Sequence, residues 1–299
     1  MNSSFGSLQQ QIVQTTETAL ACGALRPIAT QIQTVTDGDI QFCVRVVDSL
    51  IRKAAIPKAK VTSSGKRFNP FLPYEEALCV GTLSDTHVCL LNKFKVVDHH
   101  ILMVTRTYES QDDWLTAVDF EALARCLIEI DGLGFYNGGQ QAGASQHHKH
   151  LQLVPFSSQQ GIQDLPIAPL IAAQQEQIER SGYLAVLPFI HRIQFLEIHW
   201  SPVILNEVTQ ILFKTYQTLL TALEVSLTDR RPSIPYNLLI TREWMMIVLR
   251  SQEAYQDIGV NSLGYSGWLL VKTGEDLERL KQIGPLNLLC QTGYPLKQI

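Results

Sequence analysis

Apolar side chains recur every three or four residues in several segments, which is the spacing of one face of an α-helix. This spacing predicts helices over 7–21, 109–130, 169–180 and 202–225. Alternating or short unbroken apolar runs predict strands instead. They lie at 40–46, 77–80 and 86–91, in a segment that ends near residue 105, and at 147–154, 189–200, 236–241, 244–249 and 267–272. Both halves therefore contain strands around a helix, which permits a distant duplication without showing one.

Polar and small residues interrupt this pattern in three places. The basic stretch 52–67 contains Pro57, serines and a glycine, and it predicts a loop. The segment 69–75 predicts a turn region, and 157–169 is the best candidate for a linker. Gly132 and Gly134 are expected to end the helix over 109–130.

Composition limits the class of protein. The chain has 299 residues, 45% of them hydrophobic and 17% charged, which is enough apolar material for a large core and excludes wholesale disorder. The net charge of -4 argues against a bulk nucleic-acid binder. No apolar run approaches the ~20 residues of a membrane-spanning helix, and the first residues lack the pattern of a secretory signal.

The cysteines carry no metal-binding spacing. They are scattered along the chain without a Cys-x-x-Cys pair, so they indicate reduced thiols and argue against a zinc ribbon. They are Cys22, Cys43, Cys79, Cys89, Cys126 and Cys290. Together with the absence of a secretion signal, they lead us to expect a cytoplasmic protein.

The most unusual segment is FYNGGQQAGASQHHKHLQLVPF. Its first part, 137–146, consists of small and polar residues and predicts a loop whose backbone can approach a ligand closely. In the strand that follows, alternation places His148, His150 and Gln152 on one face. Three such polar groups need polar partners if they are buried. The N–H groups of the loop and the Ser145 hydroxyl are groups that bind phosphate oxygens.

Three interpretations of this strand stay open on its pattern alone. It could be a surface strand with solvated histidines. It could be a zinc site, although no nearby Cys or carboxylate completes a tetrahedral set and Gln is a weak ligand. It could also transfer a nucleotidyl group through an imidazole, with His150 attacking a phosphorus atom.

Four longer motifs occur in order and go beyond this pattern: FNPFLPYEEALCV, LLNKFKVVDHHILMVT, FYNGGQQAGASQHHKHLQ and NSLGYSGWLLVK. Together they resemble the diadenosine tetraphosphate phosphorylases, also called ATP adenylyltransferases, in the nucleotidyltransferase branch of the histidine-triad superfamily. The resemblance covers most of the chain, from Phe42 to Lys272. It implies an α+β fold, a mainly antiparallel sheet flanked by helices and enlarged to two lobes. Lobe 1–160 would carry the His-x-His-x-Gln strand, and lobe 161–299 would complete the substrate site.

The resemblance also implies an activity. Members of the family split diadenosine tetraphosphate with inorganic phosphate to give ATP and ADP, through a covalent adenylyl-histidine. The expected partners are therefore diadenosine tetraphosphate, ATP, ADP and phosphate or sulfate, with no nucleic acid and no membrane, for a monomer or homodimer. No covalently bound cofactor and no metal ligands are expected, although Mg²⁺ could accompany the polyphosphate. The alternatives are a dinucleoside polyphosphate hydrolase and a non-catalytic dinucleotide-binding sensor.

The family pattern assigns roles to individual residues. His150 is the nucleophile, and His148 belongs to the same catalytic strand. Gln152 stands where hydrolases of the superfamily have a third histidine, and it contacts the transferred phosphate. The implied substrate-binding residues are Lys53, Asn92, Lys93, Asn137, Gly143, Ala144, Ser145, Gln146, Gln152, Asn261, Ser262, Leu263, Trp268 and Lys272.

Several of these residues have a structural alternative. Lys53 lies in a basic stretch of weak similarity, Asn92 could simply end a strand, and Trp268 could belong to the core. His100 is expected to support the sheet. Structural roles are expected for His87, His99, His191 and His199.

Overall fold

The structure is a computed structural model, and it describes residues 7–47, 68–156, 165–229 and 231–296. Its helices are α1 (Leu8–Ala21), α3 (Ala117–Glu129), α4 (Ala168–Ala173), α5 (Gln175–Ser181), α6 (Leu205–Ala222), α7 (Ser262–Tyr265), α8 (Gly274–Ile283) and α9 (Pro285–Thr292). Its strands are β1 (Thr30–Asp37), β2 (Ile40–Val47), β3 (Cys79–Thr82), β4 (His87–Leu91), β5 (Ile101–Thr105), β6 (Gly132–Gly138), β7 (His150–Pro155), β8 (His191–Phe195), β9 (Tyr236–Ile240), β10 (Trp244–Leu249), β11 (Ala254–Tyr255), β12 (Ile258–Gly259) and β13 (Trp268–Val271).

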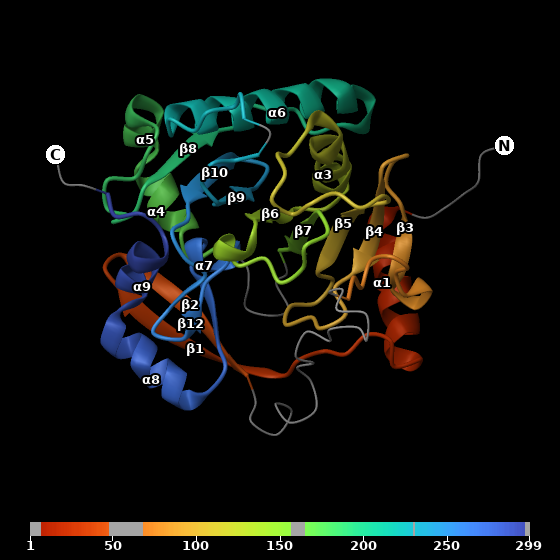
Figure 1. Cartoon of the computed structure of the whole chain (residues 1–299), viewed down its shortest axis with the longest axis horizontal. Helices are drawn as coiled ribbons and strands as arrows, with labels where there is room; N and C mark the ends of the chain where they lie inside the picture. The colour runs from red at the N-terminus through yellow and green to blue at the C-terminus, as the bar shows by residue number, and fades with distance from the viewer. Residues whose placement is uncertain (1–6, 48–67, 157–164, 230, 297–299) are drawn as a thin grey trace.

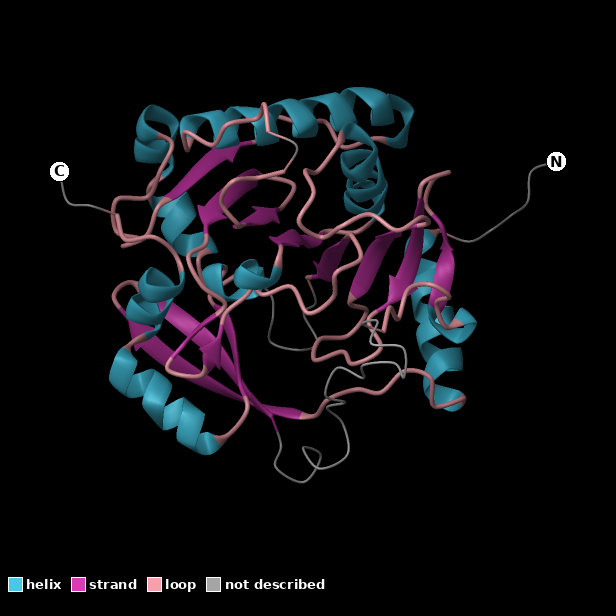
Figure 2. Cartoon of the chain, viewed as in Figure 1, coloured by secondary structure: helices cyan, strands magenta, loops and turns pink. Residues whose placement is uncertain are grey.

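One antiparallel sheet of eight strands forms the centre of the molecule (Figures 1 and 2). Its order is β3-β4-β5-β7-β6-β9-β10-β8, and all neighbouring pairs are antiparallel. Strands from the two halves of the chain meet where β6 pairs with β9, with Asn137 opposite Asn237. The α+β class with a mainly antiparallel sheet is therefore confirmed. The division into lobes at residue 160 stays a prediction, since this sheet runs across it.

The long helices cover one face of this sheet. In α6, apolar residues at helical spacing (Val208, Leu212, Leu219) pack with Leu123 and Leu127 of α3 and with the inward residues of the strands. Helix α1, capped by the Ser7 side chain, adds Leu8 and Ile12 to the same core. This face is therefore closed by apolar packing.

The other face is covered by two clusters: Phe71 packs with inward residues of β4 and β5, and a larger cluster lies over the strands from β6 to β8 at the other end of the sheet. There, helices α4, α5, α7 and α9 and a second, three-stranded sheet enclose a separate hydrophobic cluster. In the small sheet β1 pairs antiparallel with β2, and β13 lies parallel to β2 on its other edge. The small sheet therefore joins the N-terminal strands to a strand near the C-terminus.

Several predicted elements are confirmed and several boundaries were wrong. Helices α1 and α6 and strands β2, β4, β5, β9, β10 and β13 lie where the pattern placed them. The helix expected from residue 109 begins only at Ala117, because the Asp119 carboxylate accepts the N–H of Thr116 at 2.7 Å and fixes the helix start there. The helix expected over 169–180 is broken at Gln174 into α4 and α5.

The strand predictions contain similar errors. The active-site strand starts at His150 rather than at residue 147, and β8 covers only the first part of the expected 189–200. Strands β1 and β6 and helices α8 and α9 were missed. The loop 52–67, including Lys53, and most of the linker 157–169 lie outside the described residues.

Two further properties of the described residues concern their thiols and their helices. All six cysteines are free thiols. No helix in the described ranges is long and apolar enough to cross a lipid bilayer.

Candidate active site

The predicted catalytic residues lie on the face of the large sheet opposite α3 and α6. In β7, Leu151 and Leu153 point into the core under these helices, so His150 and Gln152 face the other way. His150 is paired with Val104 of β5, and Gln152 lies between Leu102 and Phe135. The strand alternation predicted from the sequence thus gives a polar row on an otherwise apolar surface.

The His150 ring is held in one orientation and one tautomer. Its Nδ1 lies 2.8 Å from the carbonyl oxygen of His148, so Nδ1 carries the proton and donates it to this acceptor. The lone pair is therefore on Nε2. Only 4% of the residue is exposed, and burial lowers the pKa of His150 from 6.5 to about 4. At neutral pH, Nε2 is therefore unprotonated and keeps its lone pair.

A glutamine that sequence reasoning missed fixes the backbone at this point. The Gln111 side-chain oxygen accepts the N–H of His150 at 2.8 Å, and its amide donates to the carbonyls of His150 (3.2 Å) and Asn137 (2.9 Å). The backbone carbonyl of Gln111 in turn accepts the Tyr136 hydroxyl at 2.6 Å. The loop before α3, predicted as helix, therefore clamps β7 and β6 together. No signal in the sequence singled out Gln111.

His148 is held by protein groups at both ring nitrogens. Its Nδ1 accepts from the Asn69 amide at 3.1 Å, and its Nε2 donates to the Thr105 carbonyl at 2.8 Å. Phe71 packs against both histidine rings, with centroid distances of 5.7 Å to His148 and 5.3 Å to His150. In this structure His148 positions His150 through its backbone carbonyl.

Gln152 ends a chain of three side chains. The Asn92 amide donates to His100 Nδ1 at 3.1 Å, and His100 Nε2 donates to Gln152 Oε1 at 3.0 Å. Burial lowers the pKa of His100 to about 4, so the ring is neutral and its single N–H is committed to Gln152. The amide group of Gln152 is thereby turned away from His100. His100, expected to support the sheet, therefore orients Gln152, the residue predicted to contact phosphate. The Asn92 side chain belongs to the same series of hydrogen bonds.

Asn137 of β6 is locked by three donors. Its Oδ1 accepts from Asn237 Nδ2 (2.9 Å), from the Ser262 N–H (2.9 Å) and from the Ser262 hydroxyl (2.7 Å). Because the oxygen is fully used, the orientation of the Asn137 amide group is fixed. Ser262 itself is fully buried, so its side chain acts on Asn137.

Behind Asn137 lies a fully buried arginine that the sequence did not single out. Arg250 donates to Asn237 Oδ1 at 2.6 Å and to the carbonyls of Ala142 (3.2 Å), Gln252 (2.7 Å) and Thr292 (2.9 Å). Its guanidinium also lies over the Tyr265 ring, 5.3 Å from the centroid. These acceptors are neutral, so the positive charge of Arg250 is retained beneath the loop 139–143.

The predicted phosphate loop packs closely on the C-terminal part of the chain. Gly143 has φ +88°, and a Cβ atom there would lie 2.6 Å from the Val260 carbonyl oxygen, so only glycine fits. The N–H groups of Gly143 and Ala144 already donate to the carbonyls of Gln140 and Gly139. Ser145, by contrast, is exposed. The part of the loop open to a ligand is therefore 145–146 rather than 143–144.

The remaining predicted residues are more scattered. Lys93 forms an ion pair with Glu75, and Lys272 is exposed just after β13. Trp268 lies in the hydrophobic core with 8% exposure. Asn261 caps α7 by accepting the N–H of Leu263 at 3.0 Å, which places both at the start of this helix. Among the described residues, no group of three or more His, Cys, Asp or Glu is placed to hold a metal ion.

Lys149, between the two histidines, points to the opposite face of β7. Its Nζ donates to Glu109 Oε2 at 2.7 Å and lies 3.4 Å from Asp119 Oδ2, while Asp119 also lies 3.1 Å from His87 Nε2. Burial raises the pKa of Asp119, but the His87 hydrogen bond and the Lys149 charge outweigh it and lower the pKa overall. This buried ionic cluster fastens the active-site strand to α3.

Acid is expected to destabilise the fold through three buried rings. Burial lowers the pKa of His100, His150 and His191 from 6.5 to about 4, so the unfolded chain binds protons in this range that the native state does not. Their contribution is complete above pH 6.5 and is lost as the pH falls toward 4, at up to about 1.4 kcal/mol per pH unit for each ring. Urea unfolding at several pH values measures this slope. An unfolding free energy that stays constant between pH 6.5 and 4.5 would contradict it.

Comparisons with known proteins identify the relatives of this chain. A family model described as Ap4A phosphorylase N-terminal domain matches residues 1–173, and one described as ATP adenylyltransferase C-terminal domain matches 185–295. In Saccharomyces cerevisiae, Diadenosine 5',5'''-P1,P4-tetraphosphate phosphorylase 2 is 30% identical over 85% of this chain and 84% of its own. Protein APA1 of the same yeast is 28% identical over 91% and 90%. The crystal structure of yeast Ap4A phosphorylase Apa2 with AMP aligns with a TM-score of 0.77 and 25% identity, covering 98% of this chain and 99% of that one.

The fold and the buried His-x-His-x-Gln strand define a nucleotidyltransferase of the histidine-triad superfamily. More specifically, the chain belongs to the Ap4A phosphorylase family, whose two domain models together match most of its length.

Proposed function

We propose that this enzyme phosphorolyses diadenosine tetraphosphate to ATP and ADP through an adenylyl group carried on His150 Nε2. The observation that carries the proposal is the His150 tautomer, since the hydrogen bond to the His148 carbonyl leaves the lone pair on Nε2. The yeast relative named as a phosphorylase of this dinucleotide supports the choice of substrate.

The chemistry consists of two displacements at one phosphorus atom. In the first, Nε2 attacks the terminal phosphorus of the tetraphosphate chain, an N–P bond forms, the P–O bond to the next phosphate breaks, and ATP leaves. In the second, an oxygen of inorganic phosphate attacks the same phosphorus, the N–P bond breaks, and ADP forms. The covalent intermediate divides one difficult displacement into two easier ones.

The surroundings of Nε2 suit these steps. The imidazole needs no separate base because its low pKa keeps it neutral. The Gln152 amide, with its oxygen occupied by His100, is available to donate to a non-bridging phosphate oxygen. Arg250 supplies buried positive charge, which favours an anionic transition state. Contacts of Lys53, Lys93, Lys272 and a Mg²⁺ ion with the polyphosphate are further proposals.

Product analysis by anion-exchange chromatography tests the proposal. With diadenosine tetraphosphate and phosphate, we expect equal amounts of ATP and ADP, and turnover should stop when phosphate is withheld. ATP and AMP formed without phosphate would instead identify a hydrolase, and absence of turnover under both conditions would identify a binding protein. Replacing phosphate by sulfate in the same assay tests the acceptor. A cytoplasmic location and a monomeric or dimeric state also stay predictions.

A further inference from the structure

Strands β6 and β7 separate at the candidate active site. Their pairing ends with Phe135 opposite Gln152, and in the same register it would next bring Asn137 opposite His150. Beyond this point, however, β6 continues its pairing with β9 and leaves β7. The two strands therefore form a fork, with His150 on one arm and Asn137, followed by the loop 139–146, on the other. We call this opening the β6–β7 fork.

The backbone of His150 points into this fork. On its other edge, the strand accepts a hydrogen bond from the Thr105 N–H at the Lys149 carbonyl. Because successive residues of a strand direct their N–H and C=O groups to opposite edges, those of His150 face β6. In an unbroken antiparallel ladder, they would exchange hydrogen bonds directly with the backbone of Asn137. In the structure, another group lies between the two residues.

The side-chain amide of Gln111 takes the place of the missing ladder bonds. Its Oε1 accepts the N–H of His150 at 2.8 Å, and its Nε2 donates to the carbonyls of Asn137 at 2.9 Å and His150 at 3.2 Å. A carboxamide offers a donor and an acceptor as a peptide group does, so it bridges the fork with the strands one amide group further apart. Gln111 is only 2% exposed, and the fork is therefore closed to bulk water at this point.

The loop that carries Gln111 is itself bonded to both arms. The N–H of Lys149 donates to the Glu109 carbonyl at 2.9 Å. The N–H of Gln111 donates to the His147 carbonyl at 2.8 Å, and the Tyr136 hydroxyl donates to the Gln111 carbonyl at 2.6 Å. These bonds hold the backbone of Gln111 in place, so its amide stays in the fork.

We propose that Gln111 is a positioning residue, whose amide sets the width of the β6–β7 fork and thereby the distance between His150 and the arm that carries Asn137. The proposal rests on the proposed function. His150 Nε2 must meet the phosphorus in line with the leaving oxygen while residues of the other arm hold the phosphate oxygens. Without the amide, His150 and Asn137 can bond directly and close the fork. A misplacement of about 1 Å is enough to lower a rate by about 100-fold.

Gln111→Met tests the proposal, because it removes the amide and keeps nearly the same side-chain length. We expect kcat for phosphorolysis of diadenosine tetraphosphate to fall by about 100-fold. The KM should stay within about threefold, since no group that contacts the substrate is removed. In a single turnover with adenine-labelled substrate, the rate of label transfer to the protein should fall by the same factor as kcat. Rates are expressed per folded protein, with the folded fraction taken from urea unfolding.

Gln111→Glu separates positioning from a loss of stability. The introduced carboxyl group is buried and faces the carbonyls of Asn137 and His150, and both conditions raise its pKa. In its protonated form it accepts from the His150 N–H and donates to one carbonyl, as the amide does. Its kcat should therefore rise toward that of the unmodified protein as the pH falls from 8.5 to 6.5. The titratable groups around this position are the same in both proteins and cancel in the comparison; they are Asp112, Asp113, Tyr136, His147, His148 and His150.

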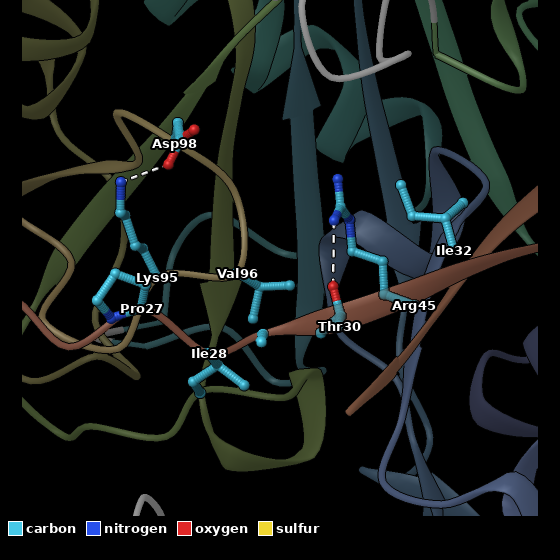
Figure 3. A pocket seen from close by; sticks show the side chains of 9 residues that line it. Pro27, Ile28, Thr30, Ile32, Arg45, Lys95, Val96 and Asp98 are labelled. Carbon is cyan, nitrogen blue, oxygen red and sulfur yellow. Dashed lines mark hydrogen bonds and ion pairs between the residues drawn. The ribbon is translucent and has the colours of Figure 1, made fainter. Parts of the chain in front are cut away.

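Two control variants each remove one hydrogen bond outside the fork. Trp114→Phe acts on the same loop, where the indole N–H donates to the Asp229 carbonyl at 2.9 Å. Figure 3 shows the second bond, from Arg45 to Thr30 Oγ1 at 3.2 Å, which joins β2 to β1 and is removed by Thr30→Val. Neither variant should change kcat by more than about twofold, because neither touches the amide that bridges the fork.

The outcomes separate the alternatives. The proposal is wrong if folded Gln111→Met keeps kcat within about threefold of normal, if Trp114→Phe loses as much activity, or if a raised KM accounts for the whole loss. If Gln111→Met does not fold, Gln111→Glu decides, and a pH profile parallel to that of the unmodified protein would overturn the proposal. If the unmodified protein does not phosphorolyse the dinucleotide, the proposed function itself fails, and the role of Gln111 in it fails too.

Discussion

Replacement of His150 by alanine is expected to lower turnover by at least about 10⁴-fold, as for loss of the nucleophile in other covalent enzymes. Binding of AMP should weaken by no more than about tenfold, roughly 1.4 kcal/mol, because Gln152 and Asn137 keep their partners. The variant should also retain no radiolabel after incubation with adenine-labelled substrate and denaturation. Turnover and calorimetric binding of AMP, measured on the same preparation, separate chemistry from binding.

The chain contains a matched control for this variant. His191 is also fully buried, its Nδ1 donates to the carbonyl two residues earlier (Phe189, 2.9 Å), and burial lowers its pKa to about 4. The difference is at Nε2, which in His191 accepts the N–H of Leu184 at 2.9 Å. His191→Ala should therefore lower the unfolding free energy but leave the activity of the folded protein near normal. Near-normal turnover in His150→Ala would exclude the covalent mechanism.

Local patterns predicted the parts of the fold that depend on local packing. The stripe of Leu205, Val208, Leu212 and Leu219 is visible in the sequence because every member faces the same core. The predicted start of α3 was wrong because the seven residues before Thr116 have helix-like spacing. In the structure these residues form the loop that places Gln111 against β7. Strand β6 was missed because its glycines suggested a helix end, whereas the lack of a side chain at Gly134 is what lets Leu123 and Ile240 pack closely.

The candidate active site likewise contains residues that local patterns predict and residues that only distant contacts bring into place. His148, His150 and Gln152 lie within five residues, so strand alternation predicted their common face. His100, Gln111 and Arg250 are 52, 39 and 108 residues from the groups they bond, Gln152, His150 and Ala142. Such contacts depend on sheet order and on loop geometry, which periodicity does not encode. The residues that hold the predicted catalytic groups therefore had to come from the structure.

Gln152→Ala is expected to lower phosphorolysis by about 10²–10³, roughly 3–4 kcal/mol, with little change in substrate binding, because a well-aimed donor acts mainly on the transition state. Gln152→Glu is the sharper variant. It keeps the size of the side chain and an oxygen that can accept from His100 Nε2, and it replaces the donating amide by a negative charge. It should lose at least as much activity as the alanine variant. If Gln152→Ala keeps full phosphorolytic activity, this side chain only completes the strand.

The role of the Gln152 amide can also be tested by changing His100, which donates a hydrogen bond to Gln152 Oε1. If His100 acts by turning the Gln152 amide toward the substrate, His100→Phe should lower kcat but have no further effect in the Gln152→Ala background, since coupled residues are not additive. Additive losses would show that His100 acts independently.

Gln152→His places a titratable group beside the adenylyl-histidine, where it can help to activate water. It should raise the ratio of AMP to ADP among the products, which one anion-exchange chromatogram per variant measures.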